Sequence, residues 1–575
     1  MTNCARIEHE IGTVSVYQEA AAERLLASSE FQAQWQNLFE KCPWGTCFQT
    51  SAFVCTWYRC YGELYQPLLL VRFAANGQMD GLLTLAVDRT TGDVTFAGAH
   101  HAEYRVWLAL PGEQTFIVDA LEQLRRLGFV SLSFAYLPPR SPTEWLQGQW
   151  AQSVIVRRER KPFMDVGDGA DPQESLRKKR NKKRMGRFQR AGALEFLQLT
   201  SPEELDWYYE DIIVFTDFRH GALHNSYPFA GDPRKRLFFR ELMRSSGLMH
   251  VTVMRAGGCL ASAHLGFKNR NEVTLGLLCY SPFFSDHSPG KFHILQLALL
   301  LHQQGISRLD LTPGGDSYKD RFATGYEEVS SMTVFFDARA LARRQVGMRS
   351  RSYAKRAALA LGLERANIAR YESLLRKAAS NPVRAARSIM HMLKRRVWGT
   401  TEMRFYRLRA GEISQQIGDP TIMRDSLRDL LCYEPAEAIQ SSKQQFLRAA
   451  MSRIEAGRHV YTHVQEGRLV HYGWLTTREI KSLITEVGCE YAYPHCTAVM
   501  WDFYTFPSSR GQGWYSRSLR HILSDVAAIA GTEYVYIAVL ANNWPSRRVI
   551  EEVGFKYHNS IVRITRFGSD TYKLD

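Results

Sequence analysis

The chain has 575 residues, enough for about three to four domains, and its 45% hydrophobic and 12% aromatic content excludes wholesale disorder. No run of about 18 uncharged apolar residues occurs, so the sequence predicts no membrane span. The first residues lack the basic-then-apolar profile of a secretory signal, and the ten cysteines show no zinc-site spacing. We therefore expect a cytoplasmic protein without a bound metal.

The net charge of +15 is concentrated in two segments. Residues 176–190 carry nine Lys or Arg and no acid, and residues 341–398 carry fifteen Lys or Arg against two acids. Together these segments hold +22, so the rest of the chain is slightly acidic at −7. Such segments suit an anionic partner, namely nucleic acid, a phosphate-rich cofactor or an anionic membrane surface.

The first part of the chain, residues 1–162, mixes strand and helix patterns. An Asn76-Gly77 turn signal lies between two apolar runs and predicts a hairpin. Apolar periodicity then predicts two strands, a helix and a further strand, in that order, at 93–97, 106–110, 115–127 and 130–134.

The second part, residues 163–340, begins with the basic run and continues with helix and strand patterns. Periodicity predicts two helices at 202–218 and 234–245, and then strands at 250–255, 259–267 and 272–280. A strongly apolar helix at 292–303 and a strand at 307–312 complete the expected order.

Residues 341–400 form the second basic segment, which has helical composition and the position of a linker. In the last part, residues 401–575, we expect strands at 403–408, 460–465, 469–475, 497–506 and 534–539, with helices around 422–431 and 443–456. The order of hairpin, long strand, loop, apolar helix and strand repeats that of the second part. We infer one architecture that is used more than once.

Two loops precede apolar helices and suit the binding of a phosphate. In the last part, a strand ends at Phe506, and Arg510-Gly511-Gln512-Gly513 opens a helix. In the second part, Ser288-Pro289-Gly290-Lys291 occupies the corresponding place. Glycines allow a tight turn that aims backbone N–H groups at an anion, and the helix dipole adds favourable charge.

The last part resembles the GNAT superfamily of acyl-CoA-dependent N-acyltransferases over residues 402–567. The family's Gln/Arg-x-x-Gly-x-Gly/Ala loop is matched at Arg510 and Gly513, and a later Asn-x-x-Ala/Ser…Gly-Phe element starts at Asn543. This resemblance implies that acyl-CoA binds at Phe506, Arg510, Gly511, Gln512, Gly513 and Asn543.

The same resemblance assigns catalytic roles in the last part. A base is needed to take a proton from the attacking ammonium, and Asp502 and Glu486 are the candidates, with Asp502 preferred. The family's usual acid, a tyrosine, is replaced here by Ile550, so Tyr504, Tyr515 or Tyr557 would have to substitute. The interpretation without catalysis is that Asp502 is a solvated carboxylate at a strand edge.

Residues 30–336 resemble the FemAB-like acyltransferases, in particular the CelD-type proteins of exopolysaccharide gene clusters. The shared features are a basic helix before Ala191-Gly192, the Ser288–Gly290 loop, and a Gly-Asp-x-x-Tyr-Lys segment at 315–319. The resemblance implies two GNAT-like lobes in tandem, with a donor site at Ser288, Gly290 and Lys291.

The resemblance also suggests roles for three residues in the 315–319 segment. Asp316 is a candidate base or a helix cap, and Tyr318 is a candidate proton donor or a packing side chain. Lys319 either contacts a phosphate or lies on a solvated face. A polar cluster near Glu103 follows two adjacent histidines, but no third ligand has regular spacing, so no metal site is expected.

The basic segments leave alternatives open. The run at 176–190 could bind the phosphates of CoA, a lipid-linked sugar or tRNA, although Phe188 is its only aromatic residue for base stacking. The segment at 341–398 contains an amphipathic basic stretch that either lies on the inner membrane face or packs as a spacer.

The expected fold is therefore α/β (α+β), with tandem GNAT-like domains, mixed central sheets flanked by helices, and a basic helical linker. The expected function is transfer of an acyl group from acyl-CoA to an amine or hydroxyl, with an amino sugar of exopolysaccharide biosynthesis as the candidate acceptor. The alternatives are a peptidyltransferase that uses aminoacyl-tRNA, and a protein in which one GNAT-like half is not catalytic.

Overall fold

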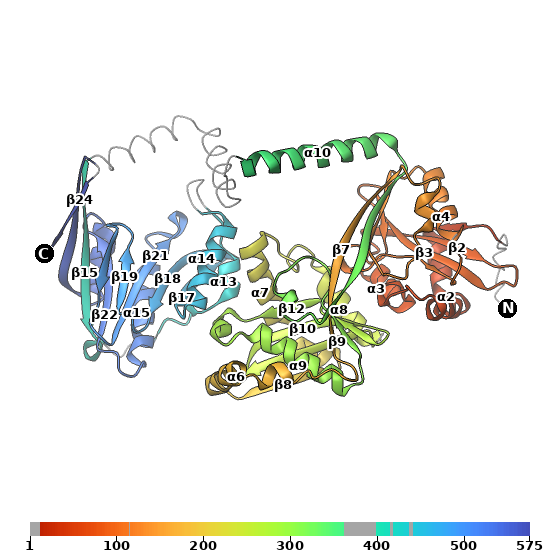
Figure 1. Ribbon diagram of the computed structural model, residues 1–575. Helices are drawn as coiled ribbons and strands as arrows, with labels where there is room; N and C mark the ends of the chain where they lie inside the picture. The colour runs from red at the N-terminus through yellow and green to blue at the C-terminus, as the bar shows by residue number, and fades with distance from the viewer. Residues whose placement is uncertain are drawn as a thin grey trace. The chain divides into compact units, whose positions relative to one another are not determined.

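The computed structural model describes residues 12–113, 115–245, 247–360, 398–413, 418–435, 441–567 and 569–575. Its contacts separate two compact units, the first comprising Met1–Ile213 with Phe229–Arg356 and the second comprising Val214–Pro228 with Ala357–Asp575. Each unit combines mixed β-sheet with flanking helices (Figure 1), which confirms the predicted fold class.

The first unit opens with a five-stranded antiparallel sheet in the order β1-β2-β3-β4, with β5 paired to β3. The strands are β1 (Ser15–Gln18), β2 (Tyr65–Phe73), β3 (Met79–Asp88), β4 (Val94–Phe96) and β5 (Leu108–Ala109). Its helices are α1 (Glu19–Ala27), α2 (Ser29–Lys41), α3 (Ser51–Tyr61) and α4 (Thr115–Arg126). The predicted hairpin is β2–β3, and its turn places Gly77 at φ 76°, a left-handed conformation that glycine adopts without strain.

A second, nine-stranded sheet has the order β6-β14-β7-β13-β11-β10-β9-β8, with β12 also paired to β10. The strands are β6 (Ser131–Leu137), β7 (Val154–Asp165), β8 (Leu194–Leu199), β9 (Met249–Ala256), β10 (Cys259–Asn269), β11 (Glu272–Thr274), β12 (Leu277–Tyr280), β13 (Arg308–Asp310) and β14 (Gly325–Phe335). The accompanying helices are α5 (Glu174–Arg177), α6 (Lys179–Ala191), α7 (Pro202–His224), α8 (Arg234–Ser245) and α9 (Pro289–Gln303). Among the described residues of this sheet, β11 and β13 form the only parallel pair, and all other pairs are antiparallel.

The second unit contains an eight-stranded sheet in the order β16-β17-β18-β21-β22-β15-β23-β24 and a separate hairpin, β19–β20. The strands are β15 (Trp398–Arg409), β16 (Met423–Arg424), β17 (His459–Gln465), β18 (Arg468–Thr476), β19 (Lys481–Ile484), β20 (Cys489–Ala492), β21 (Thr497–Thr505), β22 (Tyr534–Leu540), β23 (Lys556–Arg566) and β24 (Ser569–Leu574). The helices are α13 (Leu427–Leu431), α14 (Lys443–Glu455), α15 (Trp514–Ala527) and α16 (Trp544–Glu552).

Seven strands of the two sheets share one order, β8-β9-β10-β11-β13-β7-β14 in the first unit and β16-β17-β18-β21-β22-β15-β23 in the second. The outer strand differs, because β6 precedes β7 in the chain whereas β24 follows β23. In both, three antiparallel strands lead to one parallel pair, which is β11–β13 in one and β21–β22 in the other. In both, a long strand from earlier in the chain, β7 or β15, then lies antiparallel beside the second member of that pair. The repeated order predicted from the sequence is therefore present in the fold.

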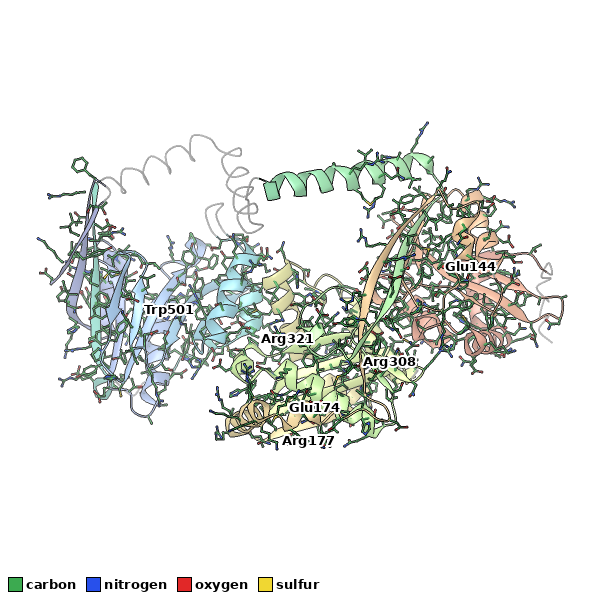
Figure 2. The ribbon with its side chains drawn as sticks, viewed as in Figure 1. Glu144, Glu174, Arg177, Arg308, Arg321 and Trp501 are labelled. Carbon is green, nitrogen blue, oxygen red and sulfur yellow. The ribbon has the colours of Figure 1, made fainter. Side chains whose placement is uncertain are left out.

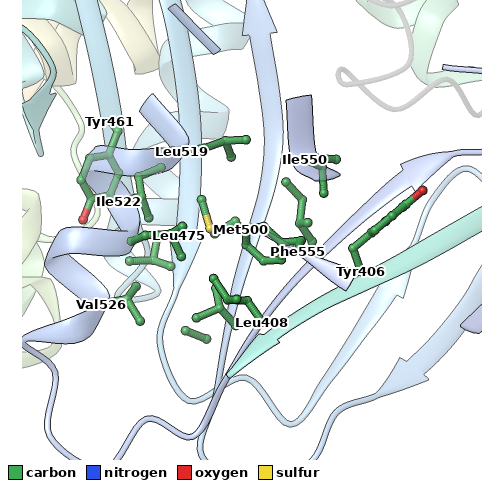
Figure 3. Close-up of a cluster of buried hydrophobic side chains, with 14 of the residues drawn as sticks. Tyr406, Leu408, Tyr461, Leu475, Met500, Leu519, Ile522, Val526, Ile550 and Phe555 are labelled. Carbon is green, nitrogen blue, oxygen red and sulfur yellow. The ribbon is translucent and has the colours of Figure 1, made fainter. Parts of the chain in front are cut away.

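The core of the second unit fixes the position of α15. The apolar face of this helix packs on side chains of the parallel pair β21–β22, including Met500 and Ile537, and Ile550 of α16 closes the same cluster (Figure 3). Because α15 follows β21 directly, this packing places the N-terminus of the helix beside the end of that strand.

Three buried histidines cross the nine-stranded sheet and α9. The rings of His250 and His264 have centroids 6.0 Å apart, and His264 and His293 follow at 6.2 Å. His293 is hydrogen-bonded at 2.8 Å to both Thr252 Oγ1 and Ser262 Oγ. Burial lowers the pKa of His250 to about 4 and that of His264 to about 3, and it also lowers the pKa of His293.

We expect the stability of the first unit to fall below pH 6.5. The unfolded chain takes up protons on these histidines near pH 6.5, whereas the folded chain does not until about pH 4 or lower, so acid favours unfolding by about 1.4 kcal/mol per pH unit and histidine. Urea denaturation at a series of pH values, read out by fluorescence, would measure this slope. The slope should be smaller in His264→Gln and unchanged in His495→Gln, an exposed site in the second unit. Equal slopes in all three proteins would contradict the assignment.

The predicted basic linker begins as α10 (Ala338–Ala360). Its remaining residues, 361–397, lie outside the described residues, and with them the amphipathic stretch proposed to contact a membrane. Among the helices that the structure describes, none has the length and apolarity that a bilayer crossing requires.

Candidate active site

The parallel pair of the first unit separates beyond its third residue pair. β11 and β13 are in register from Glu272–Arg308 to Thr274–Asp310, and the N–H of Leu275 then donates to the carbonyl of Asp310 at 2.7 Å. The chain bends at Gly276 (φ 49°), after which β12 pairs with β10. A Cβ at Gly276 would lie 2.4 Å from a backbone carbonyl oxygen, so this bend requires glycine. The two strands therefore diverge at this point.

The Ser288–Lys291 loop lies where the sequence predicted, at the N-terminus of α9. Ser288 has φ 56° and accepts a hydrogen bond on Oγ from Arg184 Nη1 at 3.1 Å. Lys291 Nζ donates to Asn181 Oδ1 at 2.6 Å. Gly290 is buried, and a Cβ there would lie 3.1 Å from the ring of Tyr280. Helix α6 is thereby bound to the first turn of α9.

Positive charge gathers at this helix N-terminus. Burial lowers the pKa of Lys291, and the positive charges of Arg184, Arg180, Arg321 and Lys178 lower it further. Arg321, labelled in Figure 2, belongs to the short helix that follows the Gly314-Gly315 loop. Lys178 is paired with Glu174 at 3.2 Å, but the other positive charges still repel one another, and the helix dipole adds to their field. The arrangement is suited to a polyvalent anion such as a pyrophosphate.

The loop after β13 orients Lys319 inward. Its ammonium donates to Thr312 Oγ1 and to the carbonyls of Thr312 and Pro313 at 3.0–3.1 Å, and it lies 3.4 Å from a carboxylate oxygen of Asp316. Asp316 is exposed, and Tyr318 is partly buried against the core beneath α9. Lys319 is thus buried, not on a solvated face, and fixes the loop conformation, while Tyr318 packs against the core.

A buried group of ionisable side chains lies at the same end of β13. Tyr104 donates a short hydrogen bond to Asp310, and Lys161 Nζ is 2.8 Å from Glu327 and 3.9 Å from Asp310. Burial raises the pKa of Glu103, and the charge of Asp310 raises it further. A carboxylate whose pKa is raised by burial and a neighbouring negative charge is a candidate general base.

The sequence indicated Glu103 only as part of a polar cluster, and it did not single out Asp310. The available signal was an acidic residue at the end of an apolar strand, in Leu309-Asp310-Leu311. The sequence does not show that residues 103 and 310 are neighbours, because only the tertiary structure brings them together.

The second unit has the same divergence between strands. β21 and β22 are in parallel register from Thr497–Tyr534 to Met500–Ile537, after which β21 continues to Thr505 and β22 to Leu540. Asp502 has φ 48°, and the register of β21 with β18 shifts beside it. This irregularity turns the strand away from its parallel neighbour.

The predicted glycine loop follows β21. Gly511 and Gly513 both have φ 81°, so both positions favour glycine, and Gly513 caps α15. Gln512 Oε1 accepts from Trp514 Nε1 at 3.0 Å, and Arg510 Nε donates to the carbonyl of Thr505 at 3.2 Å. Phe506 is buried before the loop. The guanidinium of Arg510 is therefore engaged by the loop itself.

The other predicted residues of the second unit have structural partners. Asp502 Oδ2 lies 2.5 Å from Arg453 Nη1, and Tyr504 stacks on Tyr472 with centroids 5.9 Å apart. Asn543 Oδ1 accepts from the N–H of Ser546 at 3.3 Å and caps α16. Ile550, at the position of the usual acid, is fully buried in the core.

Two segments of the chain match family models, each described as an acetyltransferase (GNAT) domain, at residues 175–320 and 411–556. Together they span half of the chain and fall on the two sheets that share one topology. The chain belongs to the GNAT superfamily of acyltransferases. We refer to the two matched segments as the first and the C-terminal GNAT domain.

Solved structures similar to this GNAT protein include three of low identity. They are a tandem GNAT protein from the clavulanic acid biosynthesis pathway (13% identity, 56% of this chain and 99% of that chain, TM-score 0.35), L-PGS from Bacillus licheniformis (10%, 53% and 92%, 0.33) and FemX (9%, 53% and 96%, 0.38). Such likeness carries no argument about activity. A comparison with curated proteins found no match.

Proposed function

We propose that the first GNAT domain is an acyl-CoA-dependent N-acyltransferase. The observation that carries this proposal is the group of cations around Lys291 at the N-terminus of α9, next to diverging parallel strands. The pyrophosphate of the donor would lie on the first turn of α9 and on Lys291 and Arg184. Its thioester would then enter the opening between β12 and the chain after β13.

The proposed reaction is direct attack of an amine nitrogen on the thioester carbonyl. The C–N bond forms, the C–S bond breaks, and the electron pair leaves on the thiolate of CoA, which takes up the second proton that the nitrogen loses. Glu103 takes the proton that the attacking ammonium must lose, and its raised pKa makes it a stronger base than an exposed glutamate. Positioning and backbone N–H groups supply the rest of the catalysis.

The proposed acceptor is a small molecule with an amine. Glu103 and Asp310 supply negative charge where a cationic amine would approach, and an amino sugar of a surface polysaccharide precursor has this chemistry. The sugar assignment rests on the resemblance to CelD-type proteins.

The C-terminal GNAT domain is proposed to be the non-catalytic half. Its candidate base, Asp502, is held by Arg453, Ile550 replaces the usual acid, and Arg510 is engaged by its own loop. The glycine loop is retained, so this domain could still hold a ligand.

An aminoacyl-tRNA donor is the second candidate, and the outward side of α6 favours it. Lys182, Lys183, Arg187 and Arg190 are exposed there, beyond what a single CoA would neutralise. RNA binding through this face would weaken steeply with salt, in proportion to the number of phosphates contacted.

Calorimetric titration of the full chain with a panel of acyl-CoAs would test the proposal. We expect Gly290→Glu to abolish binding, because the new side chain meets Tyr280 and adds negative charge to the anion site. Gly513→Glu, which strains the other loop at φ 81°, should leave this binding intact. The reverse pattern would move the donor to the C-terminal domain, and no binding by the wild type would favour the tRNA donor.

A further inference from the structure

Two imidazoles, a carboxylate and a phenol converge in the first unit, away from the proposed donor site. His100 and His101 belong to a short helical turn (Ala99–His101), Asp232 precedes α8, and Tyr61 ends α3. Asp232 Oδ2 lies 3.1 Å from His100 Nε2, 2.9 Å from His101 Nε2 and 2.8 Å from Tyr61 OH. Tyr61 OH is also 3.0 Å from His101 Nε2.

The spacing of these atoms is close to that of a tetrahedral zinc site. Zinc binds imidazole nitrogen and carboxylate oxygen at about 2.0–2.2 Å, which places neighbouring ligand atoms about 3.3 Å apart. The distances from Asp232 Oδ2 to the two imidazole nitrogens are shorter than this by a few tenths of an ångström, and the potential ligand atoms of His100, His101 and Asp232 all lie within 4.8 Å of one another. Small side-chain rotations would therefore admit the ion.

The donor set also suits zinc, because imidazole nitrogen and carboxylate oxygen are both ligands of this ion. The neighbouring ammonium of Lys235 lies over the rings of Phe229 and Phe239, at 5.1 and 5.6 Å from their centroids.

Access to the cluster is open on one side. The side chain of His100 is 60% exposed, whereas that of His101 is 1% exposed. An ion could enter beside His100, and a water molecule or Tyr61 OH could take the fourth position, as in zinc sites with three protein ligands.

We propose that His100, His101 and Asp232 bind one Zn²⁺ ion. Sequence spacing excluded such a site because no third ligand had helical or hairpin spacing, but the fold brings Asp232 to the two histidines. The bound ion would tie the segment before α8 to the turn that leads into Glu103. It is a positioning element and takes no part in the acyl transfer.

The test uses the full-length protein, freed of metal by a chelator and then titrated with ZnCl₂ against a chromophoric zinc indicator. We expect one saturable site per chain, which Co²⁺ fills with the visible absorption of a tetrahedral site. Asp232→Asn keeps the size and the hydrogen-bond acceptor but removes the charged ligand, so affinity should fall by more than the factor of about 10 that follows loss of an outer partner. Bound Zn²⁺ should raise the thermal unfolding midpoint of the wild type.

Two further variants make the outcome decisive. His100→Ala changes a largely exposed side chain, so it should fold normally by circular dichroism and lose both zinc affinity and the cobalt absorption. His495→Ala removes an exposed histidine of the second unit and should change neither. Absence of saturable zinc binding, or equal affinity in wild type, His100→Ala and Asp232→Asn, would overturn the proposal.

Discussion

Replacing Glu103 by glutamine should lower kcat/KM for acyl transfer by about 10²–10⁴-fold, the usual contribution of a general base. Glutamine has the same size as glutamate but cannot accept the proton of the attacking ammonium. Donor binding should be unchanged, because Glu103 lies beside Asp310 at the end of β13 and not at the N-terminus of α9. Steady-state kinetics together with calorimetric titration of the donor would separate the two effects.

The pH profile provides the control for this prediction. Because burial raises the pKa of Glu103, wild-type kcat/KM should fall with acidity at a higher pH than an exposed glutamate would give, and Glu103→Gln should lack this limb. Glu144→Gln, at an exposed position labelled in Figure 2, should behave as the wild type. Unchanged kinetics in Glu103→Gln would remove the residue from the mechanism.

Replacing Lys291 by glutamate should weaken acyl-CoA binding by about 100-fold. The change removes a charge-assisted hydrogen bond, worth about 1.5–3 kcal/mol, and supplies a carboxylate that itself occupies the surrounding cations. Folding should be retained, because the new carboxylate is attracted to Arg184, Arg180, Arg321 and Lys178. Calorimetric titration with the tightest acyl-CoA of the panel would measure the loss.

Lys182→Glu is the matched control, since it reverses the charge of another lysine, which lies on the exposed side of α6. A donor bound at the N-terminus of α9 should bind Lys182→Glu almost normally. If both variants weaken binding equally, the attraction is a diffuse property of α6, and the assignment of a defined anion site at α9 is wrong.

Most helices and strands could be predicted because their apolar residues form a recognisable pattern along the sequence. The apolar positions of α15 recur at helical spacing, and the β2–β3 hairpin has two largely buried apolar runs around an Asn-Gly turn. The loop at Gly511 and Gly513 could also be predicted, because a left-handed backbone conformation disfavours most residues other than glycine.

The elements that the sequence did not reveal depend on distant partners. β7 contains Arg157, Arg158, Glu159, Arg160 and Lys161, and its first half is largely exposed, so neither alternation nor an apolar run marks it as a strand. This segment is a strand because it pairs along most of its length with β14. The same limit applies to the site, since Arg453, the partner of Asp502, lies 49 residues away in the sequence and reaches it only in the tertiary structure.

The insertion of β7 and β15 has a consequence for how the chain is made. During synthesis, β6 and β7 emerge long before β13 and β14, so their backbone N–H and C=O groups stay unpaired until about residue 335 has left the ribosome. Pairing between such distant segments closes large loops and slows folding. The first half of β7 is charged, and charged strand edges resist pairing with other chains. These charges therefore disfavour aggregation while the edge of β7 is unpaired. The same charges that prevent β7 from being predicted as a strand would thus protect the nascent chain from aggregation.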